Sequence, residues 1–143
     1  MANMTDRDAI IEAYNDVRSD ETPTNWCCLK YDESNNLSLD SCGEEFDELK
    51  SKFGGDERVY AFLRVQTGDE MSKRMKFALI IWVGPGVSAI KKAKMSTEKA
   101  FVKKVFLNFA SEMFFDDLHD VKLDKVRDEL IRAGGANYGT GKH

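Results

Sequence analysis

The sequence contains little of what marks several specialised classes of protein. Two of its 143 residues are proline, three are cysteine and two are histidine, and its longest uninterrupted apolar run covers only residues 77–83. A helix that crosses a bilayer needs about 20 consecutive apolar residues, and proline-rich or disordered chains have a different composition. These scarcities exclude a membrane-spanning helix and a proline-rich or disordered chain, and they leave a packed globular protein.

The three cysteines do not suit a disulfide framework. Their number is odd, and Cys27 and Cys28 are adjacent, so a strand would point one into the core and the other to the surface. Neither belongs to a Cys-x-x-Cys zinc or redox motif. Asp6, Arg7 and Asp8 stand near the start without an apolar stretch behind them, which predicts that no secretory signal is present. Reduced thiols and the missing signal predict a cytoplasmic protein.

The histidines are too few and too poorly placed to support catalysis. His143 is the last residue, and His119 lies in an acidic stretch without a partner motif, so we expect no enzymatic activity. The sequence contains no GxxxxGK[ST] phosphate-binding motif, and Asp116, Asp117 and Asp120 lack the pattern of an EF-hand loop. No cofactor and no resident metal are predicted, and weak surface affinity for calcium is left open.

Hydrophobic periodicity predicts a mixture of helices and strands. Helices are predicted over residues 6–18, 43–53, 88–110 and 124–133, and strands over 25–31, 37–42, 58–66, 76–83 and 113–118. This order predicts one domain over residues 1–143 of the α/β class (α+β type), with a central mixed sheet of five or six strands and helices on both faces.

Local signals predict where the helices break and end. Ser96 and Thr97 are candidate N-cap residues for a break within the long helix. Gly134 and Gly135 are expected to stop the last helix. Residues 139–143 are then expected to form a flexible tail.

Positive charges are concentrated in one part of an acidic chain. The formal net charge is −4, yet residues 73–104 contain nine lysines and arginines against one acid, Glu98. This segment covers the tip of a long hairpin, predicted between residues 58–66 and 76–83, and the helix that follows. We expect its positive side chains to form one continuous exposed face for a negatively charged partner. The alternative interpretation is an ordinary solvated helix face.

The nature of that partner follows from the rest of the chain. The sequence pI of about 5.3 and the core-side placement expected for Phe101 and Phe106 argue against a nucleic acid. An acidic protein surface is favoured. An anionic phosphoinositide headgroup is left open, because clusters of about four or more lysines or arginines bind anionic lipids.

Four separated segments also match, in order and spacing, segments of a known family. They are Ala13-Tyr14-Asn15 with Val17-Arg18, Lys30-Tyr31-Asp32, the stretch Thr67-Gly68-Asp69 through Met71-Ser72-Lys73-Arg74 to Lys76-Phe77-Ala78-Leu79-Ile80, and Ala133-Gly134-Gly135-Ala136-Asn137-Tyr138. In these segments the chain resembles the coactosins, a branch of the actin-depolymerising factor homology (ADF/cofilin) family. Agreement over several motifs is more specific than one short motif.

The resemblance implies the ADF-homology fold, a mixed sheet flanked by helices, and a protein without enzymatic activity that binds filamentous actin and modulates filament dynamics. Lys76, which precedes Phe77-Ala78-Leu79, matches the position associated with filament binding in coactosins. The residues expected to bind actin are Lys73, Arg74, Lys76, Lys91, Lys92, Lys94, Lys99 and Lys103.

We further expect a monomer located in the cytoplasm and cytoskeleton. Two alternatives remain open. One is a cofilin-like protein that severs filaments or binds actin monomers. The other is a scaffold or chaperone for a cytosolic enzyme such as a lipoxygenase, because some coactosin-like proteins bind one.

Overall fold

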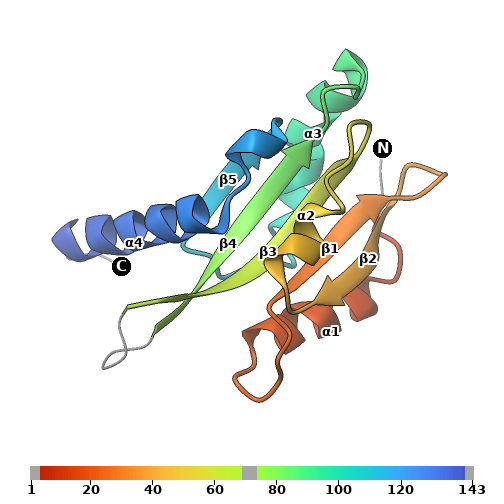
Figure 1. The fold of residues 1–143 in the computed structure, drawn as a ribbon. Helices are drawn as coiled ribbons and strands as arrows, with labels where there is room; N and C mark the ends of the chain where they lie inside the picture. The colour runs from red at the N-terminus through yellow and green to blue at the C-terminus, as the bar shows by residue number, and fades with distance from the viewer. Residues whose placement is uncertain (1–3, 69–73, 141–143) are drawn as a thin grey trace.

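A five-stranded mixed sheet forms the centre of the molecule (Figure 1). The structure is a computed structural model and describes residues 4–68 and 74–140. The strands lie in the order β2-β1-β3-β4-β5; β5 is parallel to β4 and the other neighbours are antiparallel. Their bounds are Trp26–Tyr31 for β1, Leu37–Gly43 for β2, Arg58–Thr67 for β3, Arg74–Val83 for β4 and Ser111–Phe115 for β5. The predicted mixed sheet and the predicted order of elements are confirmed.

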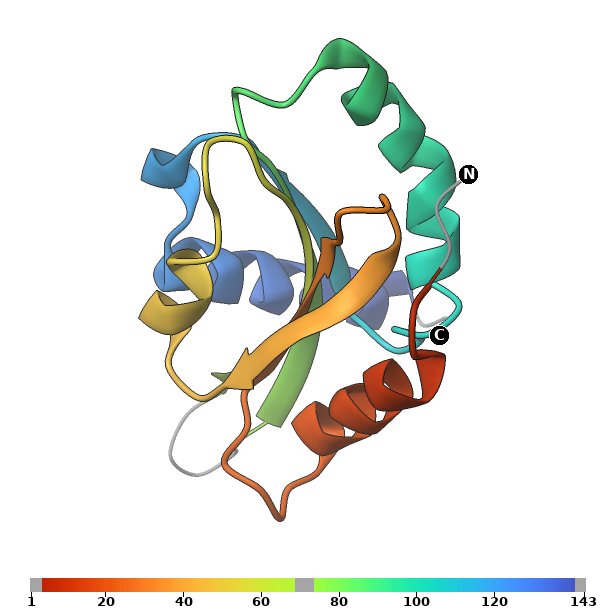
Figure 2. The same cartoon turned by 90° about the vertical axis from the view of Figure 1, so that its right-hand side faces the viewer.

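Helices cover both faces of this sheet (Figure 2). α1 (Arg7–Arg18) and α3 (Ala89–Val102) pack on one face, and α2 (Phe46–Lys50) and α4 (Leu123–Thr140) pack on the other. Strand residues alternate between the two cores: Tyr60 and Phe62 of β3 face α1 and α3, whereas Val59 and Ala61 face α2 and α4. None of the described helices combines the length and apolar composition that crossing a bilayer requires.

Coverage of both faces also explains the cysteines of β1. Cys27 lies in the core beneath α1 and α3, and Cys28 lies in the core beneath α2 and α4, so both are fully buried. The expectation that one of them would reach the surface is wrong, because a strand covered on both sides has no surface face. The exposed cysteine is Cys42, on the edge strand β2.

The long helix differs from its prediction at both its break and its end. α3 starts after Ser88, whose hydroxyl accepts a hydrogen bond from the Lys91 backbone N–H, and it runs unbroken past Ser96 and Thr97. It ends at Val102, and the turn that follows returns Val105 and Phe106 to the core. Tertiary packing of this buried side therefore overrides the capping preference of Ser96 and Thr97.

The last helix is longer than predicted and the second helix is shorter. α4 continues through Gly134 and Gly135 to Thr140, and neither glycine has the positive φ that ends a helix. Glycine in a helix costs only about 1 kcal/mol relative to alanine, so it does not by itself stop one. α2 has only five residues, Phe46–Lys50, where residues 43–53 were predicted. The flexible tail over residues 139–143 stays a prediction, and residues 141–143 lie outside the described part of the chain.

Candidate functional site

The residues predicted to bind actin fall into two groups: Arg74 and Lys76 on β4, and five lysines on α3 and at its end. Only the start of α3 lies at the opposite end of the sheet from Arg74, because Lys99 and Lys103 contact Glu112, whose ladder partner Leu79 is in the middle of β4. Arg74 opens β4 at the free end of the β3–β4 hairpin, whereas α3 begins just after the other end of β4, near Val83 (Figure 1). At about 3.3 Å per residue, the ten residues of β4 separate these ends by about 30 Å. Lys73 lies outside the described residues.

The two groups also lie on different faces. Lys76 is half-buried and pairs across the ladder with Val65, which belongs to the core beneath α2 and α4. Residues two and four positions further along β4, Ala78 and Ile80, face the same side. Because α3 covers the opposite face, the expectation of one continuous basic face is wrong. The part that each residue plays in binding stays a prediction.

The first half of α3 carries three of the lysines predicted to bind actin. Lys91, Lys92 and Lys94 are exposed, and they form no ion pair with any residue that the structure describes. Ile90, beside them, is 70% exposed. An exposed aliphatic side chain among unpaired ammonium groups offers a partner both apolar contact area and charge. We therefore expect the start of α3 to contribute more to partner binding than its second half.

Two lysines further along α3 are held by an acid on the neighbouring strand. The carboxylate of Glu112 on β5 forms ion pairs with two lysines: Lys99 Nζ lies 2.7 Å from its Oε2, and Lys103 Nζ lies 2.5 Å from its Oε1. Partial burial alone would raise the pKa of Glu112, but the hydrogen bonds from Lys103 and Lys99 outweigh it and lower the pKa below its ordinary value. Part of the charge predicted for this surface is thus neutralised within the molecule.

We expect Glu112→Gln to lower the free energy of unfolding at pH 7 by about 0.2–1 kcal/mol, the range for partly exposed ion pairs. Because the pKa of Glu112 is lowered by folding, its contribution is present above the ordinary carboxyl pKa and is lost as the pH falls through the folded value. Urea unfolding at pH 7 and at about pH 3 measures this dependence. Glu33→Gln, at an exposed glutamate outside this cluster, is the control. A difference between wild type and Glu112→Gln that is the same at both pH values would contradict the expectation.

An apolar hollow lies between α3 and the strands β4 and β5. Ile81, Val83, Met95 and Phe114 line a hollow of about 180 Å³, with Lys92 and Lys99 at its rim. Phe114 is 61% exposed although it belongs to strand β5. The sequence indicated a strand here, but only the strand order shows that β5 is an edge strand with an uncovered aromatic ring.

A buried polar network fixes α3 against the sheet. The Tyr31 hydroxyl donates a hydrogen bond to Glu98 Oε1 at 2.6 Å and lies 3.2 Å from the Tyr60 hydroxyl. The Arg58 guanidinium stacks 3.6 Å from the centre of the Tyr31 ring, and its Nη1 lies 3.8 Å from Glu98 Oε1. Burial is the main cause that raises the pKa of Tyr31. Burial also raises the pKa of Tyr60, to about 12. Glu98, the one acid of the basic segment, is thus a structural residue that sequence reasoning missed.

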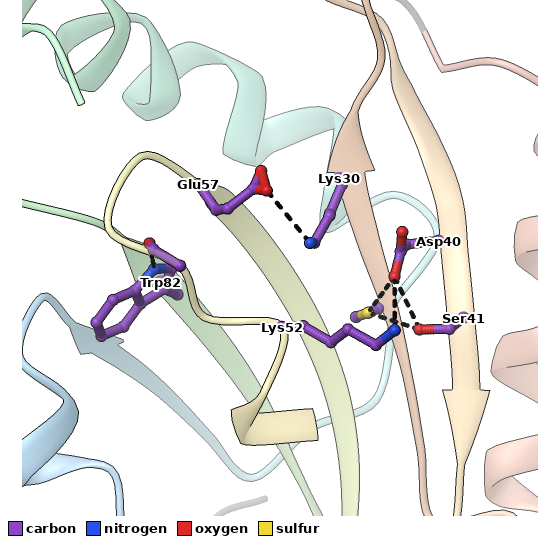
Figure 3. Close-up of polar contacts among 8 residues, drawn as sticks. Lys30, Asp40, Ser41, Lys52, Glu57 and Trp82 are labelled. Atoms are coloured by element: carbon purple, nitrogen blue, oxygen red, sulfur yellow. Dashed lines mark hydrogen bonds and ion pairs between the residues drawn. The ribbon is translucent and has the colours of Figure 1, made fainter. Parts of the chain in front are cut away.

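The described side chains show no arrangement that would activate a nucleophile. Burial raises the pKa of Cys28 to about 11, so its thiol stays protonated at neutral pH. Its neighbours Asp40 and Ser41 belong to a small polar cluster with Lys52, in which Lys52 Nζ lies 3.7 Å from Asp40 (Figure 3). His119 is 85% exposed beside Asp117. Within the described ranges, no group of three or more potential metal ligands comes together.

The sequence and the fold are similar to those of known proteins over nearly their whole length. Residues 3–131 match the family model of the Cofilin/tropomyosin-type actin-binding protein. The coactosin-like protein of cattle (Bos taurus) is 43% identical over 138 residues, which are 96% of each chain. The crystal structure of human coactosin-like protein has a TM-score of 0.86 and 38% identity, covering 92% of this chain and 99% of that one.

A further structural neighbour is named for what it binds. It is the solution structure of mouse coactosin, an actin filament binding protein, with a TM-score of 0.77, 39% identity and 99% of both chains covered. At 39% identity, the two chains are similar in sequence as well as in fold.

Proposed function

Because the chain belongs to the Cofilin/tropomyosin-type actin-binding family, in its coactosin branch, we propose that it binds the side of filamentous actin and modulates filament dynamics without catalysing a reaction. The ADF-homology fold expected from the sequence is confirmed by the match to human coactosin-like protein. The observation that carries the proposal is the similarity, over the full length of both chains, to mouse coactosin, an actin filament binding protein.

The placement of the two basic groups supports an extended partner, such as a filament, rather than a lipid headgroup. By the rise of β4, Arg74 lies about 30 Å and Lys76 about 23 Å from Val83, the end of the strand that precedes α3, and both lie on the other face of the sheet from α3. A partner that touches both groups must offer an extended surface around one edge or end of this sheet. A filament offers such a surface, whereas a single lipid headgroup is too small to contact both groups.

The start of α3 and the neighbouring strand β5 supply both charge and apolar contact area in this proposal. The unpaired lysines at the start of α3 attract acidic actin surfaces over a long range and fix the register, and Ile90 and Phe114 supply apolar contact area. Ammonium groups are compact charges that tolerate imperfect geometry. Binding is therefore expected to weaken as salt rises. We place the protein, as a monomer, in the cytoplasm and on the actin cytoskeleton.

Lys76→Ala is expected to weaken filament binding by about tenfold or more, the loss typical of a residue central to an interface. Because Lys76 is half-buried near the free end of a hairpin, its removal should leave the fold intact. Co-sedimentation with polymerised actin at several salt concentrations measures the effect. Lys52→Ala is the matched control, because Lys52 is a partly buried lysine near the β2 edge, where it pairs with Asp40.

A binding measurement with monomeric actin, set beside the co-sedimentation with filaments, separates the proposal from the cofilin-like alternative. Pelleting of the wild type with filaments, together with weak binding to monomers, supports side binding. Equal affinity for monomers, or filament shortening seen by microscopy, would instead support the cofilin-like alternative. Wild-type pelleting by Lys76→Ala would remove this residue from the site.

A further inference from the structure

Two cysteines on neighbouring strands lie directly opposite each other. In the antiparallel β1–β2 ladder the Cα partner of Cys27 is Cys42, so both side chains lie on the face that α1 covers. Directly opposite residues in such a ladder have Cα atoms about 4.5 or about 5.5 Å apart. A disulfide accepts Cα separations of about 4.4–6.8 Å. The ladder therefore holds the two Cα atoms at a separation that a disulfide accepts.

The pKa values of the two thiols indicate that they lie close together. The next rung of the ladder, whose side chains lie on the other face of the sheet, shows how near opposite side chains of these strands come: Cys28 Sγ lies 3.5 Å from Ser41 Oγ, a contact drawn at Ser41 in Figure 3. Burial is the main cause that raises the pKa of Cys27, and the next cause is the charge of Cys42. Burial also raises the pKa of Cys42, and the carboxylate of Asp16 on α1 raises both values further. The two thiols thus share one environment beneath α1.

Their accessibility differs in a way that gives each a separate part. Cys42 is exposed on the edge strand, whereas Cys27 is 0% exposed, and both are free thiols in the structure. We propose that Cys27 and Cys42 form an oxidative modification site, at which a small peroxide such as hydrogen peroxide joins them in an intramolecular disulfide. The exposed thiol meets the oxidant, and the buried one closes the bridge.

The reaction has two balanced steps. In the first, the sulfur of Cys42 attacks one peroxide oxygen, the O–O bond breaks, and Cys42 becomes a sulfenic acid while one water leaves. In the second, the sulfur of Cys27 attacks the sulfur of Cys42, the S–O bond breaks, and the oxygen leaves as a second water with the proton from Cys27. Each peroxide molecule is reduced to two waters, and the two thiols lose two hydrogens. Raised thiol pKa values make the reaction slow, because the thiolate is the attacking form.

The bridge would fasten one edge of the sheet. It would tie the edge strand β2 to β1 and close the loop of residues 28–41 in the unfolded chain, which stabilises the folded state. β2 lies at the opposite edge from β5, so both basic groups stay unchanged. This proposal therefore does not depend on the proposed function.

The test treats the full chain with hydrogen peroxide, blocks the remaining thiols with N-ethylmaleimide, and measures the intact mass and a tryptic map. The expected product has lost two hydrogens and contains the peptides of residues 19–30 and 31–50 joined together. Fragmentation should place the bond at Cys27 and not at Cys28, and dithiothreitol should reverse it. The oxidised protein should also unfold at a higher urea concentration than the reduced protein.

Two variants control for the third cysteine and for folding. Cys42→Ser changes an exposed residue and should abolish both the hydrogen loss and the shift in the urea midpoint. Cys28→Ser should retain both. A bond to Cys28, a bond between two molecules, further oxidation of Cys42 with Cys27 left free, or no reaction would each overturn the proposal.

Discussion

Replacing Glu98 with alanine is expected to lower the free energy of unfolding by about 3–5 kcal/mol, the cost of breaking a buried ion pair from one side. Glu98 is 3% exposed and accepts the hydrogen bond of Tyr31. Without its carboxylate, the guanidinium of Arg58 stays buried, with its hydrogen bond to Asn35 and its stacking on Tyr31 as remaining contacts. The uncompensated charge causes the loss.

Arg58 is already incompletely satisfied in the wild type, which makes it sensitive to this change. Its Nη1 atom is buried and has no hydrogen-bond partner among the described residues, although Glu98 lies 3.8 Å away. A domain of this kind is stabilised by only about 5–15 kcal/mol in total, so the loss is a large fraction. We also expect α3 to loosen, since Glu98 is its main polar contact with β1 and β3.

Urea unfolding followed by circular dichroism measures the change. Glu129→Ala is the control, because Glu129 pairs with Arg132 in a partly exposed pair on α4 and should cost at most about 1 kcal/mol. The double variant Glu98→Leu with Arg58→Met should recover much of the loss, since it removes both buried charges. A loss below about 1 kcal/mol for Glu98→Ala would contradict the prediction.

The order of elements was predictable because it depends on local patterns. In residues 7–18, apolar side chains such as Ile10, Tyr14 and Val17 recur at helical spacing. In β3 and β4 the apolar residues are nearly continuous. Each pattern distinguishes a helix from a strand over a short stretch of sequence. The ends were less predictable, because Ser96 and Gly134 have preferences worth about 1 kcal/mol that packing overrides.

The candidate site was predictable in composition but not in arrangement. The sequence shows that lysines are concentrated over residues 73–104, yet it does not show that β4 separates Arg74 from Lys91. Nor does it show that Glu112, outside that segment, binds Lys99 and Lys103. Such contacts depend on strand order and on the parallel pairing of β5, which bring together residues distant in sequence.

Removing the indole of Trp82 is expected to have a comparably large effect on stability. Trp82 is 1% exposed near the end of β4, and its Nε1 donates a hydrogen bond to the Gly54 carbonyl at 2.8 Å (Figure 3). Its ring stacks on Phe53 with centroids 5.3 Å apart and planes 7° apart. Trp82→Ala should lower the free energy of unfolding by about 3–5 kcal/mol, because it leaves a cavity and removes the hydrogen bond.

The position of Trp82 links this loss to the start of α3. The Gly54 carbonyl belongs to the loop before β3, and this loop also contacts the turn after β4, where Gly86 N–H donates to the Gly55 carbonyl at 2.7 Å. A Cβ atom on Gly84 would lie 2.2 Å from the Gly55 carbonyl oxygen, so the two loops are in close contact. Trp82 therefore supports the segment from which α3 begins.

Two further variants separate the causes of the Trp82 effect. Trp82→Phe retains an aromatic ring for Phe53 but no donor for Gly54, and should cost about 1–3 kcal/mol, the penalty for an unpaired buried group. Phe114→Ala removes an exposed ring and should change stability by at most about 0.5 kcal/mol. Urea unfolding of the three variants gives the ranking. If Trp82→Phe lowered the free energy of unfolding as much as Trp82→Ala, the hydrogen bond rather than packing would be the main cause. If Trp82→Ala lowered it no more than Phe114→Ala, Trp82 would not support this end of the sheet.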